Sequence, residues 1–294
     1  MTRPVVVGID DIEHSADAVA AAAREAELRQ APLWLGHAYH WVAPAAVGMM
    51  PGADTPEGAV RDAATELLTR AAAEVHAAHP DLDVHTFAMS GQPGQCLADL
   101  AKDAALLVVG GRGRGGFTGM LLGSVALSAV AHTRCPVLVV RGGAERPAVT
   151  GRVLVGVSVL SPTGGADALG FAFEEAGLHG WDVRALHAWE DPGYLYPVAH
   201  AGLPRSELNE MNAQRRRHLD SLAALWREKH PGVFVEIQVL IGTPSRLLVD
   251  SSRLADLVVL GARRHRDGDG VRLGGLAHAV LHHAHCPVLI VPEP

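Results

Sequence analysis

The amino-acid sequence repeats itself at a nearly constant spacing. Residues 135–140 read CPVLVV and return at 286–291 as CPVLIV, which is a spacing of 151 residues. The same spacing joins three further pairs of glycines: Gly91 and Gly242, Gly110 and Gly261, Gly123 and Gly274. Because only two copies are present, the pattern indicates a duplicated domain, not a solenoid.

Each copy alternates strand-like and helix-like segments. In the first copy, apolar runs predict strands at residues 5–9, 33–38, 84–89, 106–109 and 137–140. Runs of this length are typical of strands buried on both faces of a parallel sheet. Helices are expected between them, the first from about Ser15, as N-cap, to Arg29. The sequence therefore predicts α/β architecture, with helices on both faces of each sheet. The predicted domains are residues 1–144 and 151–294, with the linker at 142–147.

Composition excludes several classes of protein. The 294 residues are 48% hydrophobic and 19% charged, which is enough apolar material for two cores. No run approaches the roughly 18 apolar residues that a membrane helix needs, and the N-terminus does not resemble a signal peptide. A net charge of −7 argues against nucleic-acid binding. Three cysteines without CxxC spacing fit a reducing compartment, so a cytoplasmic location is expected.

The most informative segment is the glycine-rich stretch from Gly110 to Ser124, which leaves a predicted buried strand and enters a helix. Glycines let backbone N–H groups approach a ligand closely, and a helix start offers unpaired donors and positive charge to a phosphate. The letters GxGxxG occur at 111–116, but they follow the fourth strand, not the first, and no acidic residue follows at the required distance. GxxxxGK[ST] is absent from the sequence, which argues against a P-loop NTPase.

The spacing Gly110-x2-Gly113-x9-Gly123-Ser124, followed by RCPVLVV at 134–140, resembles the ATP-binding signature of the universal stress protein family. The resemblance covers nearly the whole chain as a tandem pair. It implies two five-stranded parallel sheets of strand order 3-2-1-4-5. In such a sheet a ligand binds where the strand order reverses, which is between strands one and four.

Carried onto matching positions, the resemblance implies an ATP site, with or without Mg²⁺, in the first copy. Asp10 would contact the adenosine part, Gly8 would line its cleft, and Ala38 would meet adenine through its backbone. The remaining expected contacts surround the glycine loop: Val109, Gly110, Arg112, Gly113, Gly123, Ser124 and Val125. The sequence departs from the family at Asp11 and Glu13, where a small Gly-Ser turn is usual.

The second copy has lost key residues of this signature. Arg264 stands in place of Gly113, Gly275 in place of Ser124, and Ser158 in place of Asp10. A side chain at a glycine of positive φ costs about 1–2 kcal/mol, and Gly275 removes a hydroxyl. One ATP per chain is therefore expected, in the first copy only. The basic loop around Arg264 is either a different anion site or a solvated surface loop.

Three functions are compatible with the sequence. The resemblance implies a regulatory, stress-response protein that binds ATP and forms homodimers through edge strands such as 137–140 and 288–291, or an internal pseudo-dimer. The alternative is an enzyme, at most a slow ATPase or another adenine-nucleotide-processing enzyme, with Asp11 and Glu13 as metal ligands. A third is an interaction module with two vestigial sites.

No catalytic residue or metal site is predicted. His278 and His282 have i, i+4 spacing, but the sequence identifies no third ligand for a zinc ion. Cys96, near a helix start, is a candidate for a lowered thiol pKa.

Overall fold

The chain divides into two compact units, Met1–Gly143 and Ala144–Pro294, here unit 1 and unit 2. The computed structural model describes residues 2–39, 56–111, 122–141, 149–159, 165–191, 204–264 and 271–293. Of the helices in these ranges, none combines the length and apolarity needed to cross a lipid bilayer.

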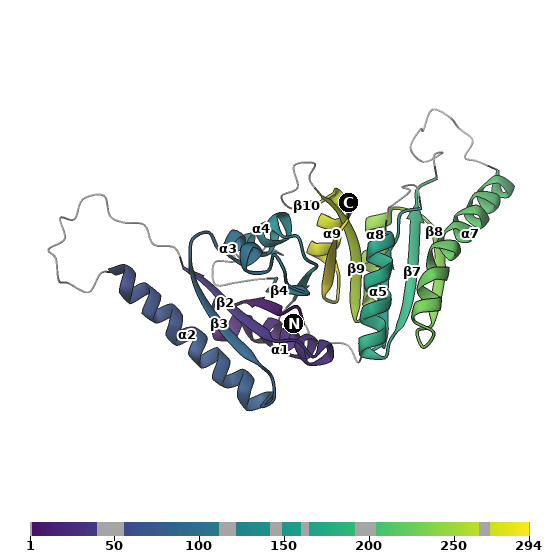
Figure 1. Ribbon diagram of the computed structural model, residues 1–294. Helices are drawn as coiled ribbons and strands as arrows, with labels where there is room; N and C mark the ends of the chain where they lie inside the picture. The colour runs from purple at the N-terminus through teal and green to yellow at the C-terminus, as the bar shows by residue number, and fades with distance from the viewer. Residues whose placement is uncertain are drawn as a thin grey trace, which may run out of the picture. The chain divides into compact units, whose positions relative to one another are not determined.

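Unit 1 is a parallel sheet with alternating helices (Figure 1). Its neighbouring strands all pair in parallel, in the order β3-β2-β1-β4-β5. This order confirms the predicted α/β fold and the predicted reversal between the first and fourth strands. In chain order the elements are β1 (Val5–Gly8), α1 (Ile12–Arg29), β2 (Leu33–Tyr39), α2 (Pro56–Ala78), β3 (Val84–Ser90), α3 (Pro93–Leu100), β4 (Leu106–Gly110), α4 (Ser124–His132) and β5 (Val137–Val140).

The helices of unit 1 cover the two faces of the sheet in pairs. Helix α1 contacts α2, and α3 contacts α4, so each pair forms one layer (Figure 1). Three of the four residues of the central strand β1 are fully buried, since Val5, Val6 and Val7 have 0% exposure. Its last residue is glycine for a packing reason, because a Cβ on Gly8 would lie 2.6 Å from Cδ1 of Leu97 on α3. A side chain there would force the Leu97 side chain to move.

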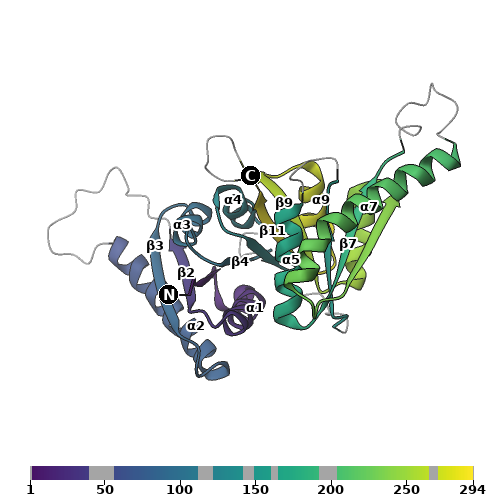
Figure 2. The same cartoon turned by 45° about the vertical axis from the view of Figure 1, so that its right-hand side comes forward.

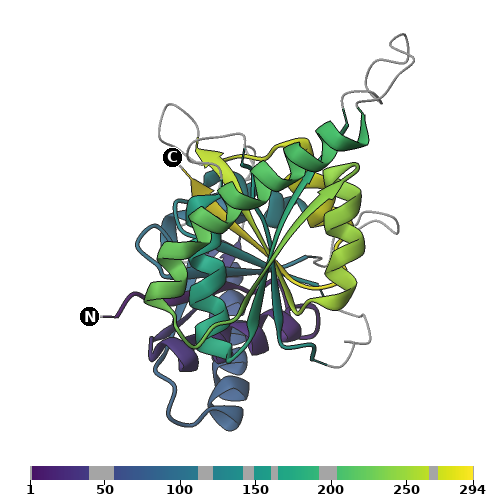
Figure 3. The same ribbon diagram turned by 90° about the vertical axis from the view of Figure 1, so that its right-hand side faces the viewer.

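Unit 2 repeats the architecture, with the order β8-β7-β6-β9-β11 and parallel pairing throughout. Helices α5 and α7 lie side by side on one face (Figure 2), and the strands separate them from α8 (Figure 3). The elements are β6 (Arg152–Gly156), α5 (Ala166–His179), β7 (Asp182–Trp189), α7 (Arg205–Lys229), β8 (Val235–Ile241), α8 (Pro244–Ser251), η1 (Ser252–Leu254), β9 (Leu257–Arg264), β10 (Val271–Arg272), α9 (Gly275–His283) and β11 (Val288–Glu293).

The duplication extends to backbone conformation. Gly91 and Gly242, which precede the equivalent helices α3 and α8, have φ of +143° and +146°. Residues with a side chain rarely adopt such backbone angles, so glycine is required at both positions. This agreement explains why the pair Gly91 and Gly242 recurs in the sequence.

The units differ at the carboxyl end of the fourth strand. In unit 1, β4 ends at Gly110, whereas in unit 2, β9 continues past the equivalent Gly261 to Arg264. The short strand β10 then returns antiparallel to β9, with Arg272 opposite Arg263. Strand β11 is longer than β5 as well and ends at Glu293. At the carboxyl end of its strands, unit 2 therefore has two additional stretches of strand pairing, one between β9 and β10 and one between β9 and β11. Ligands of such a fold bind at this end.

Candidate functional site

The candidate site of unit 1 lies where the strand order reverses. Strands β1 and β4 are parallel neighbours, with Val7 opposite Val108. Their carboxyl ends therefore meet at the same edge of the sheet, with the β1–α1 connection on one side and the β4–α4 connection on the other. Asp10 follows β1 and Gly111 follows β4, so the topology brings the two predicted halves of the site together.

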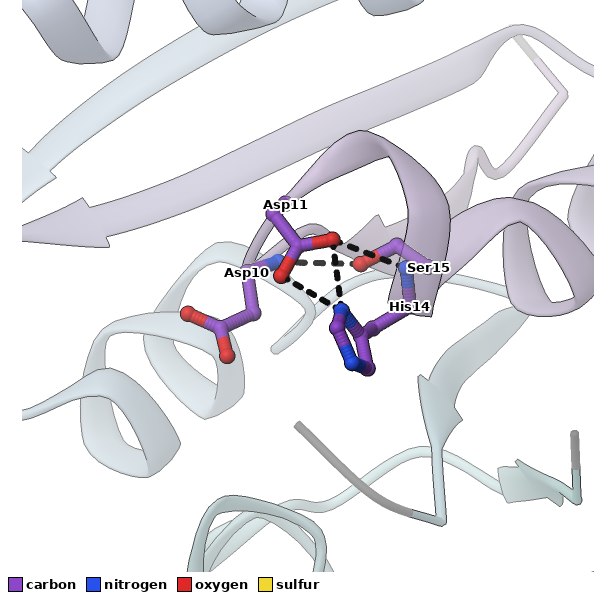
Figure 4. Close-up of polar contacts among 4 residues, drawn as sticks. All are labelled: Asp10, Asp11, His14 and Ser15. Carbon is purple, nitrogen blue, oxygen red and sulfur yellow. Dashed lines mark hydrogen bonds and ion pairs between the residues drawn. The ribbon is translucent and has the colours of Figure 1, made fainter. Parts of the chain in front are cut away.

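Asp10 and Asp11 have different roles at the start of α1 (Figure 4). Asp11 is the N-cap, because its Oδ1 accepts a hydrogen bond of 2.8 Å from the backbone N–H of His14. Its Oδ2 also lies 2.8 Å from Nδ1 of His14. The exposed carboxylate of Asp10 points away from this cluster. The contact of Asp10 with a ligand remains a prediction, while Asp11, the expected metal ligand of the enzyme alternative, serves as the helix cap.

The prediction that Ser15 caps α1 is wrong. The helix begins at Ile12, and Ser15 lies within its first turn. The Oγ of Ser15 instead accepts a hydrogen bond of 3.0 Å from the backbone N–H of Asp10. Both Asp11 and Ser15 are good cap residues, and only the fold decides which of them is used. The bond from Asp10 fixes the backbone that carries the exposed carboxylate.

The two ends of the glycine loop are held together. The N–H of Gly111 donates to the carbonyl of Val140 at 2.7 Å, and the N–H of Gly123 donates to the carbonyl of Gly111 at 2.7 Å. The chain on either side of residues 112–121 therefore meets at one point beside β4. The predicted contacts Arg112 and Gly113 lie outside the described residues.

Helix α4 begins at this point without a side-chain cap from its own N-cap residue. Its N-cap is Gly123, which supplies no side-chain hydrogen bond, and Ser124 and Val125 follow as exposed residues. The first N–H groups of a helix have no partner within the helix and carry partial positive charge. Gly123 has φ of −75°, which any residue can adopt, so its glycine is not needed for a special backbone angle. What it provides is an approach to these donors without a Cβ.

A histidine bond fixes the adjoining end of β1. Nδ1 of His37, on β2, donates to the carbonyl of Ile9 at 2.7 Å. Ala38 follows on the same strand, opposite Met89 of β3, and Val109 on β4 is 2% exposed. The structure thus gathers most of the predicted contact residues at one end of the sheet, namely Gly8, Asp10, Ala38, Val109, Gly110, Gly123, Ser124 and Val125. That these residues contact a ligand remains a prediction.

Unit 2 keeps the hydrogen bond from the histidine of its second strand, and two aromatic and cationic side chains lie further along that strand and on α7. Nδ1 of His187 donates to the carbonyl of Val157 at 2.9 Å, and burial lowers the pKa of His187, which favours its neutral form. Next along β7, Trp189 donates from Nε1 to Asn212 at 2.8 Å. The guanidinium of Arg215 lies 3.9 Å from the centre of the Trp189 ring. A cation–π pair of this kind stabilises the guanidinium, but Nε of Arg215 and Nε2 of His187 are buried without a hydrogen-bond partner among the described residues.

Sequence reasoning missed Glu293. Its carboxylate accepts hydrogen bonds from the backbone N–H groups of Gly165 and Ala168, at the start of α5. The position equivalent to Glu293 in the first copy is Gly142. This difference between the copies, two residues after the repeated segment CPVLIV, is the one sequence signal that could have pointed to Glu293. The neighbouring sequence does not indicate that the hydrogen-bond partners of Glu293 lie more than a hundred residues away.

The prediction for Cys96 is wrong. Burial raises the pKa of its thiol, and the nearby Asp99 raises the pKa further. The helix start does not compensate for these two effects. On α9, the ring centres of His278 and His282 lie 4.5 Å apart, as their spacing predicts.

Comparison with known proteins agrees with the architecture. Residues 1–141 and 150–292 each match the universal stress protein family. Universal stress protein Rv2623 of Mycobacterium tuberculosis (strain H37Rv) is 33% identical, with 98% of this chain and 96% of that protein covered. A universal stress protein of Mycolicibacterium smegmatis is 32% identical over 98% and 96%. The crystal structure of a universal stress protein from Archaeoglobus fulgidus DSM 4304 covers 100% of both chains, with a TM-score of 0.69 and 17% identity.

Fold and site together define a tandem pair of doubly wound α/β domains, in each of which the strand order reverses between the first and the fourth strand. The two family matches cover most of the chain, and relatives of similar length align along all of it. The chain belongs to the universal stress protein family.

Proposed function

We propose that unit 1 binds ATP and that unit 2 does not, and that nucleotide occupancy serves a regulatory role in the stress response. The observation that carries the proposal is the convergence of Asp10 with the open N-terminus of α4 at the edge shared by β1 and β4. A carboxylate suits the hydroxyls of a ribose, and uncapped helix donors suit phosphate oxygens. The two features lie on the two sides of one crevice.

The chemistry of the α4 end favours a phosphorylated ligand. The backbone N–H groups at Ser124 and Val125 are helix-terminal donors, and the hydroxyl of Ser124 adds a further polar group. Phosphate binding at a glycine-rich loop that enters a helix is a general use of this geometry. Arg112 and Gly113 belong to the proposal on their sequence positions alone.

The restriction to unit 1 rests on the residues exchanged in unit 2. Ser158 has no carboxylate to replace that of Asp10, and Gly275 has no hydroxyl to replace that of Ser124. Strand β9 also continues through Ala262 and Arg263, where unit 1 has its loop. An extended, paired strand directs its N–H groups to neighbouring strands and so offers them less readily to a phosphate.

The direct test is mass spectrometry of nucleotide released from freshly purified full-length protein. We expect an adenine nucleotide at close to one per chain. Gly113→Arg, which copies residue 264 of the second repeat, should come out empty. Protein that carries no nucleotide, and does not bind added ATP in equilibrium dialysis, would refute the assignment.

A cytoplasmic location and dimer formation, within the chain or between chains, are part of the same proposal. Sedimentation of the full-length protein with and without ATP tests whether occupancy changes assembly. An unchanged sedimentation coefficient would remove assembly as the output of nucleotide binding.

A further inference from the structure

In unit 2, a carboxylate of the chain itself lies at the start of helix α5. Oε2 of Glu293 accepts from the N–H of Gly165 at 3.1 Å, and Oε1 accepts from the N–H of Ala168 at 3.2 Å. Gly165 is the N-cap of α5 and has no side chain to offer. Glu293 therefore satisfies two donors at the helix start that would otherwise remain open.

The same carboxylate covers the end of β9. A Cβ placed on Gly261 would overlap the carboxylate carbon and oxygens of Glu293, so the carboxylate lies directly against the Gly261 backbone. Glu293 is only 6% exposed. Gly261 is the counterpart of Gly110, so this carboxylate occupies the crevice between the fourth strand and the first helix of its unit.

In unit 1 a different residue accepts the hydrogen bond at the start of the first helix. There the third helical residue, His14, receives its cap from Asp11, three positions away. In unit 2 the third helical residue, Ala168, receives its cap from Glu293, 125 positions away. Gly142, which stands in place of Glu293 in the first copy, has no side chain to extend into the crevice.

We infer that Glu293 closes the space between the end of β9 and the start of α5, as a built-in carboxylate that keeps an anionic ligand from the donors there. The assignment rests on the proposed restriction of nucleotide to unit 1 and adds one obstacle on the α5 side of unit 2; the counterpart of the proposed α4 phosphate contacts is the start of α9. A phosphate and a carboxylate are both anions with hydrogen-bond acceptors only, so they compete for the same amide donors and repel one another when both are near. As long as Glu293 holds Gly165 and Ala168, a phosphate at the start of α5 has neither the donors nor the space.

The charges around Glu293 fit this role. Burial raises the pKa of its carboxyl, and the two backbone hydrogen bonds act in the opposite direction. Asp167 raises the pKa further, whereas Arg263, opposite Glu293 on β9, lowers it. The carboxylate is thus held by backbone donors and one neighbouring cation.

The test uses the full-length protein and inorganic phosphate, with the amide NMR signals of Gly165 and Ala168 as the readout. In the wild-type protein these signals should not move with phosphate. In Glu293→Gly, which copies Gly142, they should shift in a saturable manner, with an affinity at least about tenfold above any wild-type response. Glu293→Ala opens the crevice equally and serves if the glycine variant does not fold.

Glu174→Gln is the matched control, because it removes an exposed carboxylate from the same helix and should leave both signals unresponsive. The inference is overturned if the wild-type signals respond as strongly as those of the variant. It is equally overturned if the folded Glu293→Gly or Glu293→Ala protein does not respond. Both signals belong to unit 2, so the result does not depend on whether unit 1 binds nucleotide.

Discussion

Unit 1 and unit 2 share the same strand order, but different residues lie at the carboxyl ends of their first and fourth strands. In both, a histidine of the second strand donates to the carbonyl after the first strand, at 2.7 Å from His37 and 2.9 Å from His187. After the fourth strand, unit 1 has a backbone hydrogen bond between Gly123 and Gly111, whereas unit 2 has the β9–β10 pairing and the Glu293 carboxylate. The scaffold is shared, and the part that would touch a ligand is not.

The comparison shows that the start of the first helix is capped in both units, by a nearby residue in unit 1 and by a distant one in unit 2. Gly165 and Ala168 need an acceptor whether or not a ligand is present, and Glu293 supplies one. A carboxylate that satisfies a helix start also adds a buried negative charge, which opposes the binding of phosphate. The same side chain therefore stabilises α5 and closes the crevice.

The largest expected effect is on nucleotide affinity in unit 1. Asp10→Ser, which copies Ser158, should weaken ATP binding by about 1.5–3 kcal/mol, because it removes a charged hydrogen-bond acceptor. Isothermal titration of the full-length protein measures this change. Asp17→Ser is the matched control, since it removes an exposed carboxylate further along α1 and should leave the affinity unchanged. An unaltered affinity in Asp10→Ser would remove Asp10 from the site.

A smaller effect is expected at Gly261. Gly261→Ala should destabilise unit 2 by about 1–3 kcal/mol, because the new methyl group overlaps the Glu293 carboxylate. Urea unfolding of the full-length protein, followed at amide signals of β9, measures the loss. In a Glu293→Gly background the cost of the alanine should fall, which a double-mutant cycle reports as coupling.

Gly156→Ala is the control for that cycle. Its Cβ would lie 2.6 Å from Cδ2 of Leu260, so it is destabilising for a reason unrelated to Glu293. Glu293→Gly should not reduce its cost. Equal costs of Gly261→Ala with and without Glu293 would show that the carboxylate does not occupy the position assigned to it.

The smallest expected effect is a pH dependence confined to unit 2. The pKa of Glu293 is raised by burial, so the folded state binds this proton more tightly than the unfolded state does. The resulting stabilisation is fully present below the unfolded-state pKa of about 4.3 and is lost as pH rises through the folded-state pKa. Glu293→Gln should flatten this decline in urea unfolding followed at β9. A decline of the same size in the variant would assign the titration to another group.

The fold could be predicted because its signals are local and repeated. Five apolar runs in the first copy become β1 to β5 with ends within one residue of the prediction, and glycines with equal backbone angles recur at Gly91 and Gly242. The reversal between the first and fourth strands followed from the family resemblance, and the observed pairing of β1 with β4 confirms it. Each apolar run by itself predicts a buried strand, so the strands could be predicted without knowledge of how they pair.

Details of the site were harder to predict, because neighbouring residues compete for one role. Asp10, Asp11 and Ser15 all have side chains that can cap a helix, and only the folded backbone assigns the cap to Asp11 and the exposed position to Asp10. Cys96 lies near a helix start, yet burial decides the direction of its pKa shift. Burial depends on the surrounding elements, which the local sequence does not contain.

The sequence by itself determined the duplication, the alternation of strands and helices, and the residues that differ between the copies at the glycine loop. Only the tertiary structure decided that Glu293 lies against Gly261 and bonds to Gly165 and Ala168, 128 and 125 positions away. Periodicity and glycine spacing record interactions within a few residues along the chain. A contact between the end of one strand and the start of a distant helix exists only once the sheet has placed them side by side.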